Sequence, residues 1–442
     1  MLMMYFYLIM LIIYMMLNFN LIFIMNMFFF FFFFLLLFNN MSMLMFNVSL
    51  SFGLDFCSYG LILLSTWICL LNMMVSLNYF NFNNFYMLNN LILLFILILM
   101  FSNLNLFYFY IMFESSLFPI ILMIMGWGNQ TDRIQAGIYL LFYTLMFSLP
   151  MLIAIMKIKI VNETMFMMLI NNIDFLLIYL IMVVSFLVKM PMYFIHLWLL
   201  KAHTEAPLGG SMILAGILLK MGGYGLIRMM KFMILLSLKY SFLWISVSIL
   251  GGLYMSMMCI IQLDMKLLIA CSSIVHMSLV ISGLMTMFNF GFYSSYVLMI
   301  GHGLSSSGLF ILVNFYYNLF SSRSLIINKG MLSLFPILSL WWFLILISNM
   351  AAPPSLNLLG EIGLIISILN WSFLNLVFIM MMSFFSVVYS LYLFTSSQHG
   401  KFMFNMLLFL IGNYKDYLIL FMHWFPLNLL ILKVDFLFLL FN

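Results

Sequence analysis

Six ionisable side chains interrupt the apolar runs of this 442-residue sequence: Glu114, Lys189, Lys220, His276, His302 and Glu361. An ionisable group at the centre of a bilayer costs at least ~2.5 kcal/mol on insertion scales, so each one is a candidate for function. Burial moves the pKa of a carboxyl group up and that of an amine down, toward neutral pH. A group that titrates near neutral pH takes up and releases protons readily. The chemistry that fits this set is therefore proton uptake, transfer and release.

The depth of these residues within their apolar runs strengthens this interpretation. Glu114 lies about 12–14 Å of helical rise beyond the start of its run, and Lys220 lies about 18 Å beyond Leu208. Snorkelling from a helix end explains many single lysines, and structural hydrogen bonding explains many buried histidines. Six such residues at similar depth favour function over either explanation.

Two further histidines follow Lys189 at intervals of seven residues, His196 and His203. The three side chains share one helical stripe only if the helix continues past Pro191. Proline removes a backbone donor and tends to break a helix, so this stripe is weak evidence.

The composition requires a membrane to position these residues. The chain is 67% hydrophobic and only 6% charged, with a mean hydropathy of +1.26. A soluble domain carries roughly a quarter charged residues. The net charge of +5 comes from scattered lysines and arginines, which excludes a basic patch for nucleic acid. No cleavable signal peptide is expected.

Metal chemistry is not indicated by the cysteines, because none of the four belongs to a C-x-x-C pair. We expect them to be small apolar fillers within helices. The four are Cys57, Cys69, Cys259 and Cys271.

About fourteen spans are long enough to cross a bilayer, at about 20 apolar residues each, and they form a single membrane domain. The Asn40–Asp55 loop is expected to form a small hairpin or a surface helix. The predicted spans are 2–18, 20–38, 57–76, 89–105, 106–125, 136–157, 174–198, 208–230, 241–261, 265–286, 292–318, 335–351 with 355–370, 372–395 and 409–432.

Two of these spans are interrupted by proline, at Lys189-Met190-Pro191 and at Ala351-Ala352-Pro353-Pro354. Broken helices at corresponding places in two halves of a chain point to an ion site in inverted-repeat transporters. Ordinary proline kinks of membrane helices are the alternative interpretation.

The residue usage suggests a mitochondrial gene. The chain has 48 Met and 52 Phe, and Phe28–Phe34 is an unbroken run of Phe. Animal mitochondria read an extra codon as Met, and AT-rich genomes favour Phe. We therefore expect a multi-pass protein of the mitochondrial inner membrane, with the Phe run as lipid-facing filler.

Several motifs resemble a known family, and the resemblance runs over most of the chain, loosely in the first hundred residues. They include Phe113-Glu114-Ser115-Ser116-Leu117-Phe118-Pro119, Phe186-Leu187-Val188-Lys189-Met190-Pro191, Glu205-Ala206-Pro207, Leu219-Lys220-Met221-Gly222-Gly223 and Asn349-Met350-Ala351-Ala352-Pro353-Pro354 with Gly360-Glu361. The chain resembles the chain 4 family of NADH-ubiquinone oxidoreductase, antiporter-like membrane subunits of respiratory complex I.

This resemblance implies an all-α fold of fourteen transmembrane helices with two inverted five-helix repeats, broken near Pro191 and Pro353. It divides the chain into amino-terminal helices (1–88), a first repeat (89–232), a second repeat (241–395) and a carboxy-terminal helix (396–442). By motif, the proton path of the family falls on Glu114, Lys189, Lys220, His276, His302 and Glu361. His196 and His203 match histidines that link this path to the matrix side.

The resemblance also implies what the chain does not do alone. It implies a subunit of an enzyme, the proton-translocating NADH:ubiquinone reductase, with no redox centre of its own. NADH, FMN, iron–sulfur clusters and ubiquinone would be bound by other subunits. Neighbouring antiporter-like chains 2 and 5 and lipids are the expected partners, and nucleic acid is not.

One departure from the family pattern lies at Leu200, where members usually have proline; it affects the backbone between His196 and His203. Two other functions stay open at this point. One is a free-standing cation/proton antiporter, and the other is a structural membrane scaffold with vestigial charges.

Overall fold

The computed structural model describes residues 2–17, 21–37, 46–49, 51–76, 83–128, 130–401 and 414–433. Nearly all of them are helical, because a helix satisfies its backbone polar groups internally and lipid offers them no partners. The first half contains α1 (Leu2–Met16), α2 (Leu21–Leu37), α3 (Phe56–Ser76), α4 (Asn83–Ser102), α5 (Leu106–Ser115), α6 (Leu117–Trp127), α7 (Arg133–Asn162), α8 (Leu176–Lys189), α9 (Leu197–Glu205), α10 (Leu208–Ile213), the π-helical η1 (Leu214–Leu218) and α11 (Leu219–Met230).

The second half is built in the same way. It contains α12 (Ile234–Ile261), α13 (Met265–Met285), α14 (Asn289–Phe320), α15 (Met331–Leu334), α16 (Pro336–Asn349), α17 (Leu356–Trp371), η2 (Phe373–Asn375), α18 (Leu376–Gln398), α19 (Tyr414–Leu429) and η3 (Leu430–Lys433).

Fourteen membrane-crossing paths can be traced in the described part of the chain. Nine are helical stretches long and apolar enough to cross a bilayer alone, among them α5–α6 and α10–η1–α11 taken as continuous paths. The others are α1, α2, α19 and the two broken pairs α8–α9 and α16–α17. This confirms the predicted polytopic helical fold.

The broken paths hold equivalent places in the two halves. From α4 onward, α8–α9 is the fourth path of five, and from α12 onward, α16–α17 is again the fourth of five. Chain direction reverses at each connection, so two paths five apart run in opposite senses. That is the arrangement of an inverted repeat with a discontinuous helix in each copy.

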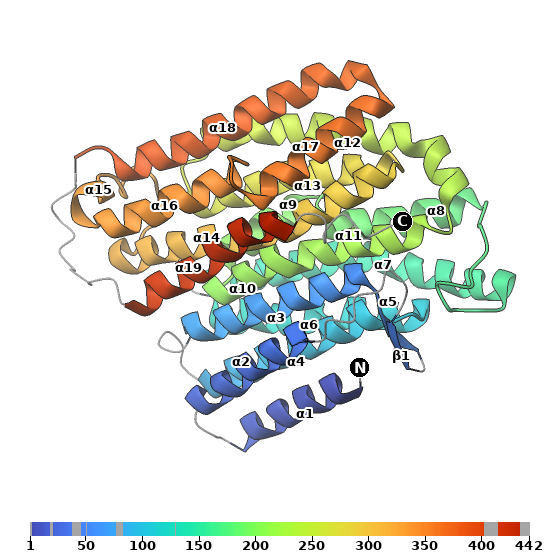
Figure 1. Ribbon diagram of the computed structural model, residues 1–442. Coiled ribbons are helices and arrows are strands. Elements are labelled where there is room, and N and C mark those ends of the chain that lie inside the picture. The colour runs from blue at the N-terminus through green and yellow to red at the C-terminus, as the bar shows by residue number, and fades with distance from the viewer. Residues whose placement is uncertain are drawn as a thin grey trace.

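The helices that carry Lys220, His276 and His302 form the centre of the molecule. Over an 18-residue stretch, α10–η1–α11, α13 and α14 are buried at 100%, 94% and 100% of positions, whereas α7 and η2–α18 are buried at only 33%. Figure 1 shows α18 along one edge and α1 along the opposite edge, with α11, α13 and α14 between them. A protonatable group on a central helix is therefore shielded from lipid.

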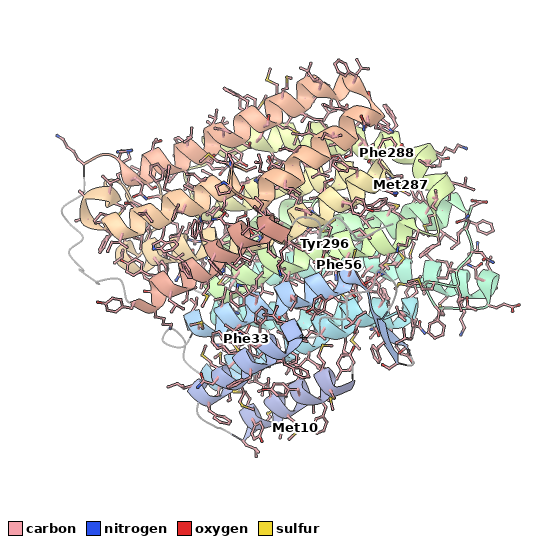
Figure 2. The ribbon with its side chains drawn as sticks, viewed as in Figure 1. Met10, Phe33, Phe56, Met287, Phe288 and Tyr296 are labelled. Atoms are coloured by element: carbon pink, nitrogen blue, oxygen red, sulfur yellow. The ribbon has the colours of Figure 1, made fainter. Side chains whose placement is uncertain are left out.

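The amino-terminal segment is tied to the centre at the start of α3. Strands β1 (Phe46–Ser49) and β2 (Phe52–Leu54) form an antiparallel hairpin, which agrees with the hairpin expected within Asn40–Asp55. Residues 40–45 and 50 lie outside the described part. The Tyr296 hydroxyl of α14 donates to the Phe56 carbonyl at 3.4 Å, and Figure 2 shows the two residues side by side.

The Phe run of α2 is only partly lipid-facing, which corrects the expectation for Phe28–Phe34. Phe30 and Phe33 are exposed, but Phe28 and Phe31 are fully buried. Phe31 stacks on Tyr7 of α1 with ring centroids 5.2 Å apart. One helical face of the run therefore packs α2 against its neighbours.

The predicted 106–125 span is confirmed as the single stretch Leu106–Trp127, in which Ser116 separates α5 from α6. Pro119 has no N–H to donate to the carbonyl of Ser115, so the helix cannot continue unbroken. The 174–198 span is longer than predicted, because α9 extends to Glu205. Residues 409–413 of the last predicted span lie outside the described residues.

Candidate functional site

A direct contact joins Lys220 and His302 at the crossing of α11 and α14. The Lys220 Nζ lies 3.1 Å from Nδ1 of His302, and both side chains are almost completely buried. Glycines make this close approach possible, since a Cβ on Gly303 would lie only 3.0 Å from the carbonyl oxygen of Gly216. Small residues at a helix crossing allow backbones in a membrane to approach in this way.

The π-helical η1 immediately precedes Lys220 and supplies a second partner. The Lys220 ammonium donates to the carbonyl of Ala215 within η1. Single π turns inside membrane helices often occur at functional sites, because they misalign backbone carbonyls from the regular ladder. Lys220 is thus held between a backbone oxygen and an imidazole that can exchange a proton.

The second pair is formed by His276 of α13 and Glu361 of α17. The His276 Nδ1 lies 3.1 Å from Oε1 of Glu361. The rings of His276 and His302 have centroids 5.3 Å apart, inclined at 48°. Helices α11, α14, α13 and α17 therefore bring Lys220, His302, His276 and Glu361 into one line of titratable groups. The line consists of two bonded pairs whose imidazole rings lie next to each other, without a hydrogen bond between the rings among the described residues.

Glu114 and Lys189 form a separate group on α5 and α8. The Lys189 Nζ donates to the Phe113 carbonyl at 2.5 Å and lies 3.1 Å from the centre of the Phe113 ring. The opposite charges of Glu114 and Lys189 interact electrostatically. Within the described residues, neither carboxylate oxygen of Glu114 has a hydrogen-bond partner. The pair is close enough to couple and is not locked by a direct bond.

Lys189 and Lys220 are not joined directly. No hydrogen bond or ion pair links them among the residues that the structure describes, although their helices pack closely. A Cβ on Gly222 would lie 2.9 Å from both the Phe186 carbonyl oxygen and the Met190 nitrogen, so only glycine fits there. The residues expected for the path therefore lie next to one another from Lys220 onward, with an interruption before it.

His196 and His203 do not share a helical stripe with Lys189, because α8 ends at Lys189. Pro191 cannot donate to the Leu187 carbonyl, which instead accepts from the Met192 N–H at 3.2 Å. His196 stands at the end of the resulting loop, where it stacks on Tyr193 with centroids 5.3 Å apart.

His203 lies deeper, on α9, where it stacks on Phe310 with centroids 4.9 Å apart. In the described part of the chain, neither of its ring nitrogens has a hydrogen-bond partner. Lys220 and Lys266 both interact with it electrostatically. His203 therefore stands between the central line and a further lysine.

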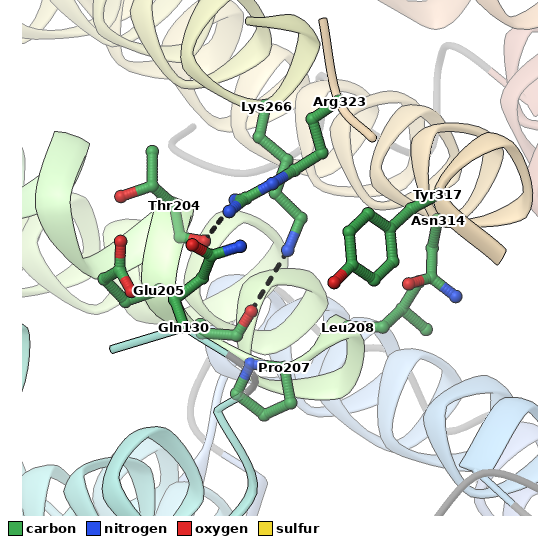
Figure 3. A pocket seen from close by; sticks show the side chains of 10 residues that line it. Gln130, Thr204, Glu205, Pro207, Leu208, Lys266, Asn314, Tyr317 and Arg323 are labelled. Atoms are coloured by element: carbon green, nitrogen blue, oxygen red, sulfur yellow. Dashed lines mark hydrogen bonds between the residues drawn. The ribbon is translucent and has the colours of Figure 1, made fainter. Parts of the chain in front are cut away.

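That lysine marks a polar pocket which the sequence did not reveal (Figure 3). Lys266 donates to the Ala206 carbonyl at 3.1 Å, and Arg323 donates to the Thr204 carbonyl at 2.5 Å. Glu205 and Tyr317 also line the pocket, whose volume of about 20 Å³ for water centres exceeds the ~10–15 Å³ that one water needs. The pocket could have been identified from the Glu205-Ala206-Pro207 motif, because the sequence suggested no partner for the Glu205 carboxylate.

The cysteines agree with the expectation of small fillers, since all four are buried with free thiols. Across the described residues, no three His, Cys, Asp or Glu side chains group as metal ligands would.

Two family models match the chain. One is described as NADH-ubiquinone oxidoreductase chain 4, amino terminus, and matches residues 1–100. The other is described as NADH:quinone oxidoreductase/Mrp antiporter, TM, and matches residues 103–386. The family likeness therefore includes the first hundred residues, where the motifs are weakest.

Similar proteins in solved structures share the fold. A chain of respiratory complex I from Thermus thermophilus with bound NADH has a TM-score of 0.87, at 19% identity over 99% of both chains. A chain of the Mrp complex from Dietzia sp. has a TM-score of 0.74, at 16% identity over 80% of this chain and 68% of that chain.

Curated relatives are much more similar in sequence. A protein of Aedes aegypti is 56% identical over 88% of this chain and 89% of its own length. A protein of Ceratitis capitata is 52% identical over 88% of both chains. Both are NADH-ubiquinone oxidoreductase chain 4, and with both family models they establish that this chain belongs to the NADH-ubiquinone oxidoreductase chain 4 family.

Proposed function

We propose that this chain translocates protons across the mitochondrial inner membrane as a membrane-arm subunit of respiratory complex I. The observation that carries the proposal is the line from Lys220 through His302 and His276 to Glu361. A lysine in such a site can release its proton, unlike arginine, and histidine can accept one on either ring nitrogen. The line can therefore pass a proton between α11 and α17.

Glu114 and Lys189 act as the electrostatic switch of this path in our proposal. Two unit charges 4 Å apart interact by about 4 kcal/mol at an effective dielectric near 20. An energy of that size changes the proton affinity of a member of the pair by more than two pKa units, and a more distant group such as Lys220 feels a smaller change of the same sign. Closing or opening the Glu114–Lys189 pair would thus alter proton retention by Lys220 without a bond between the two lysines.

His203 connects the path to one membrane surface, and His196 borders the same break in the helix. The polar pocket around Lys266 lies two residues beyond His203, at the Glu205–Pro207 turn. A pocket with room for a water molecule, beside a histidine whose ring nitrogens have no hydrogen-bond partner within the described part of the chain, offers water a place to exchange protons.

Redox chemistry is assigned to other subunits in this proposal, which therefore hold NADH, FMN, iron–sulfur clusters and ubiquinone. The neighbouring antiporter-like chains 2 and 5 are the proposed contacts within the membrane. The mitochondrial location is supported by the Met-rich and Phe-rich composition and by the insect relatives. A free-standing antiporter is not favoured, because the close relatives all bear the complex I chain name.

The test uses the assembled complex in sealed vesicles, with proton uptake measured against NADH oxidised. Glu361→Gln keeps the shape of the side chain but removes its charge, and is expected to lower the ratio of protons to NADH. Ser383→Ala, at an exposed serine of α18, serves as the control. An unchanged ratio in fully assembled Glu361→Gln complex would refute the proposed path.

A further inference from the structure

Both broken helices are bridged by the same kind of hydrogen bond at the same positions. In the first, the indole Nε1 of Trp198 donates to the carbonyl of Val188 at 3.0 Å. In the second, the amide Nδ2 of Asn357 donates to the carbonyl of Ser348 at 2.8 Å. Each donor is the second residue of the later half-helix, and each acceptor is the second-last residue of the earlier half-helix.

The chemistry of a helix end explains why such a bridge is needed. The last carbonyls of a helix have no partner within the helix. Inside a membrane no bulk water replaces that partner, so an unpaired carbonyl is costly. Trp198, Val188, Asn357 and Ser348 are all buried, so lipid and solvent do not reach either carbonyl. The Ser348 carbonyl also accepts from the Ala351 N–H at 3.4 Å, so there the Asn357 amide adds a second, shorter bond.

The first bridge fixes the position of Lys189. Val188 directly precedes Lys189, and a bond to the Val188 carbonyl holds the last turn of α8 against α9. From this turn the Lys189 ammonium reaches the Phe113 carbonyl on α5. Loss of the indole N–H would leave the Val188 carbonyl free to attract the neighbouring ammonium, because a buried unpaired acceptor recruits the nearest donor.

The second bridge fixes the position of Glu361. Asn357 and Glu361 are four residues apart on α17, and so lie on one helical face. The Asn357 amide also donates to Ser305 of α14 at 3.2 Å, one turn beyond His302. Asn357 thus joins α16, α17 and α14 beside the contact between Glu361 and His276.

We infer that Trp198 and Asn357 are paired positioning residues, which set the proton affinity of Lys189 and of Glu361 by bridging the two broken helices. The inference rests on the proposed function and assigns a role to two residues that make no proton transfer themselves. Both are uncharged, so they act only through the neighbouring charged group.

The pH dependence of protons transported per NADH is the measurement that distinguishes a positioning role from a purely structural one. The charged group that faces Lys189 is Glu114 of α5, which in turn interacts with Tyr110 of the same helix. The titratable groups that face Glu361 are His276 of α13 and Tyr389 of α18. The bridge itself contains no titratable group, so a changed pH profile reports on these neighbours.

Trp198→Phe and Asn357→Leu remove the two bridging donors in the assembled complex. A hydrogen bond of ordinary strength corresponds to roughly a fivefold change in an equilibrium constant, or about 0.7 pH unit. We expect the midpoint pH of protons transported per NADH to shift by about that amount in each variant. Asn357→Gln retains the amide donors. Its midpoint pH is expected to lie between those of the wild type and of Asn357→Leu.

Matched controls remove similar bonds elsewhere. Trp244→Phe deletes the bond from the Trp244 indole of α12 to the Tyr179 hydroxyl, which lies near the start of α8, and Gln398→Leu deletes a buried amide bond to the Tyr316 hydroxyl. Neither bond lies at the break of α8–α9 or of α16–α17, so neither should shift the midpoint. If one bridging variant fails to assemble, the other decides, because each bridge is expected to act on its own charged group.

The outcomes separate the inference from the proposed function. An unshifted midpoint in assembled Trp198→Phe or Asn357→Leu complex overturns the inference. An equal shift in the control variants overturns it as well. If Lys189→Met and Glu361→Gln also leave proton transport unchanged, the proposed function fails instead.

Discussion

The Lys220 ammonium and the His302 imidazole meet at 3.1 Å, where Gly303 lets α14 pass close to the Gly216 carbonyl of η1, directly before α11. Among the described residues neither side chain has a carboxylate partner at this point, and the ammonium is otherwise bonded to the Ala215 carbonyl. A charge that is not compensated locally is costly to keep inside a protein. The contact therefore joins a proton donor directly to a base.

Lys220→Met keeps the length of the side chain and removes the proton. We expect NADH-driven proton transport to fall severalfold, because the line to Glu361 loses its first member. Lys220→Arg should be no better, since arginine keeps its charge at all relevant pH values. Proton uptake by reconstituted vesicles measures both effects, and full activity of the arginine variant would contradict proton release at this position.

Gly222→Ala tests whether the contact between α11 and the break after α8 matters. The new Cβ would lie 2.9 Å from backbone atoms of Phe186 and Met190, which cannot move aside as a flexible side chain could. Overpacking of this kind costs about 1–3 kcal/mol, so we expect a complex that dissociates at lower temperature. Gly126→Ala is the control, because nothing lies within 4 Å of its Cβ. Equal thermal stability of the two variants would show that α11 can move away from the end of α8 without loss of stability.

Asp55, just before α3, and Arg228, near the end of α11, form a partly buried ion pair at 2.5 Å. Arg228→Met should destabilise the chain by about 3 kcal/mol, the lower end of the range for a broken buried pair, because the Asp55 carboxylate loses its counter-ion but keeps the Ser58 N–H. Lys159→Met, at an exposed position of α7, should have little effect. Thermal dissociation of the detergent-solubilised complex measures the difference, and a loss no larger than the control's would indicate that the pair is dispensable.

The same pair predicts a dependence on pH. Burial raises the pKa of Asp55, but attraction to Arg228 and hydrogen bonds from Arg228 and Ser58 outweigh it, so its pKa lies below the usual range. The stabilisation is therefore complete above the unfolded pKa of about 3.9, and is lost as the pH falls through the folded value. Wild-type stability should drop in this acid range, and the drop should be smaller in the Arg228→Met complex.

Hydropathy was enough to predict the spans and the depth of Lys220, because both depend only on position along one helix. The partners of these residues could not be predicted in that way. His276 and Glu361 are brought together by packing between α13 and α17, which no local spacing encodes. Pro119 is the residue whose type indicates, from the sequence alone, the division between α5 and α6.

Lys266 was missed for a different reason. As the second residue of α13 it has the position of an ordinary snorkelling lysine at a helix end. Only the packing of α13 against α9 buries it beside His203. Its depth in the molecule is a tertiary property, whereas the depth of Lys220 is evident from its own span.

The pocket around Lys266 gives the last prediction. Lys266 binds the Ala206 carbonyl and interacts electrostatically with His203, whose ring nitrogens lack partners among the described residues. A positive charge at this point opposes protonation of the histidine, so its removal should favour a proton on His203. We expect Lys266→Met to move the midpoint pH of proton transport per NADH upward. Lys201→Met is the control, because that lysine lies on the exposed side of α9 over the Tyr139 ring. A midpoint that stays in place, or that moves equally in the control, would exclude His203 from the access route, since its protonation would then not limit proton entry.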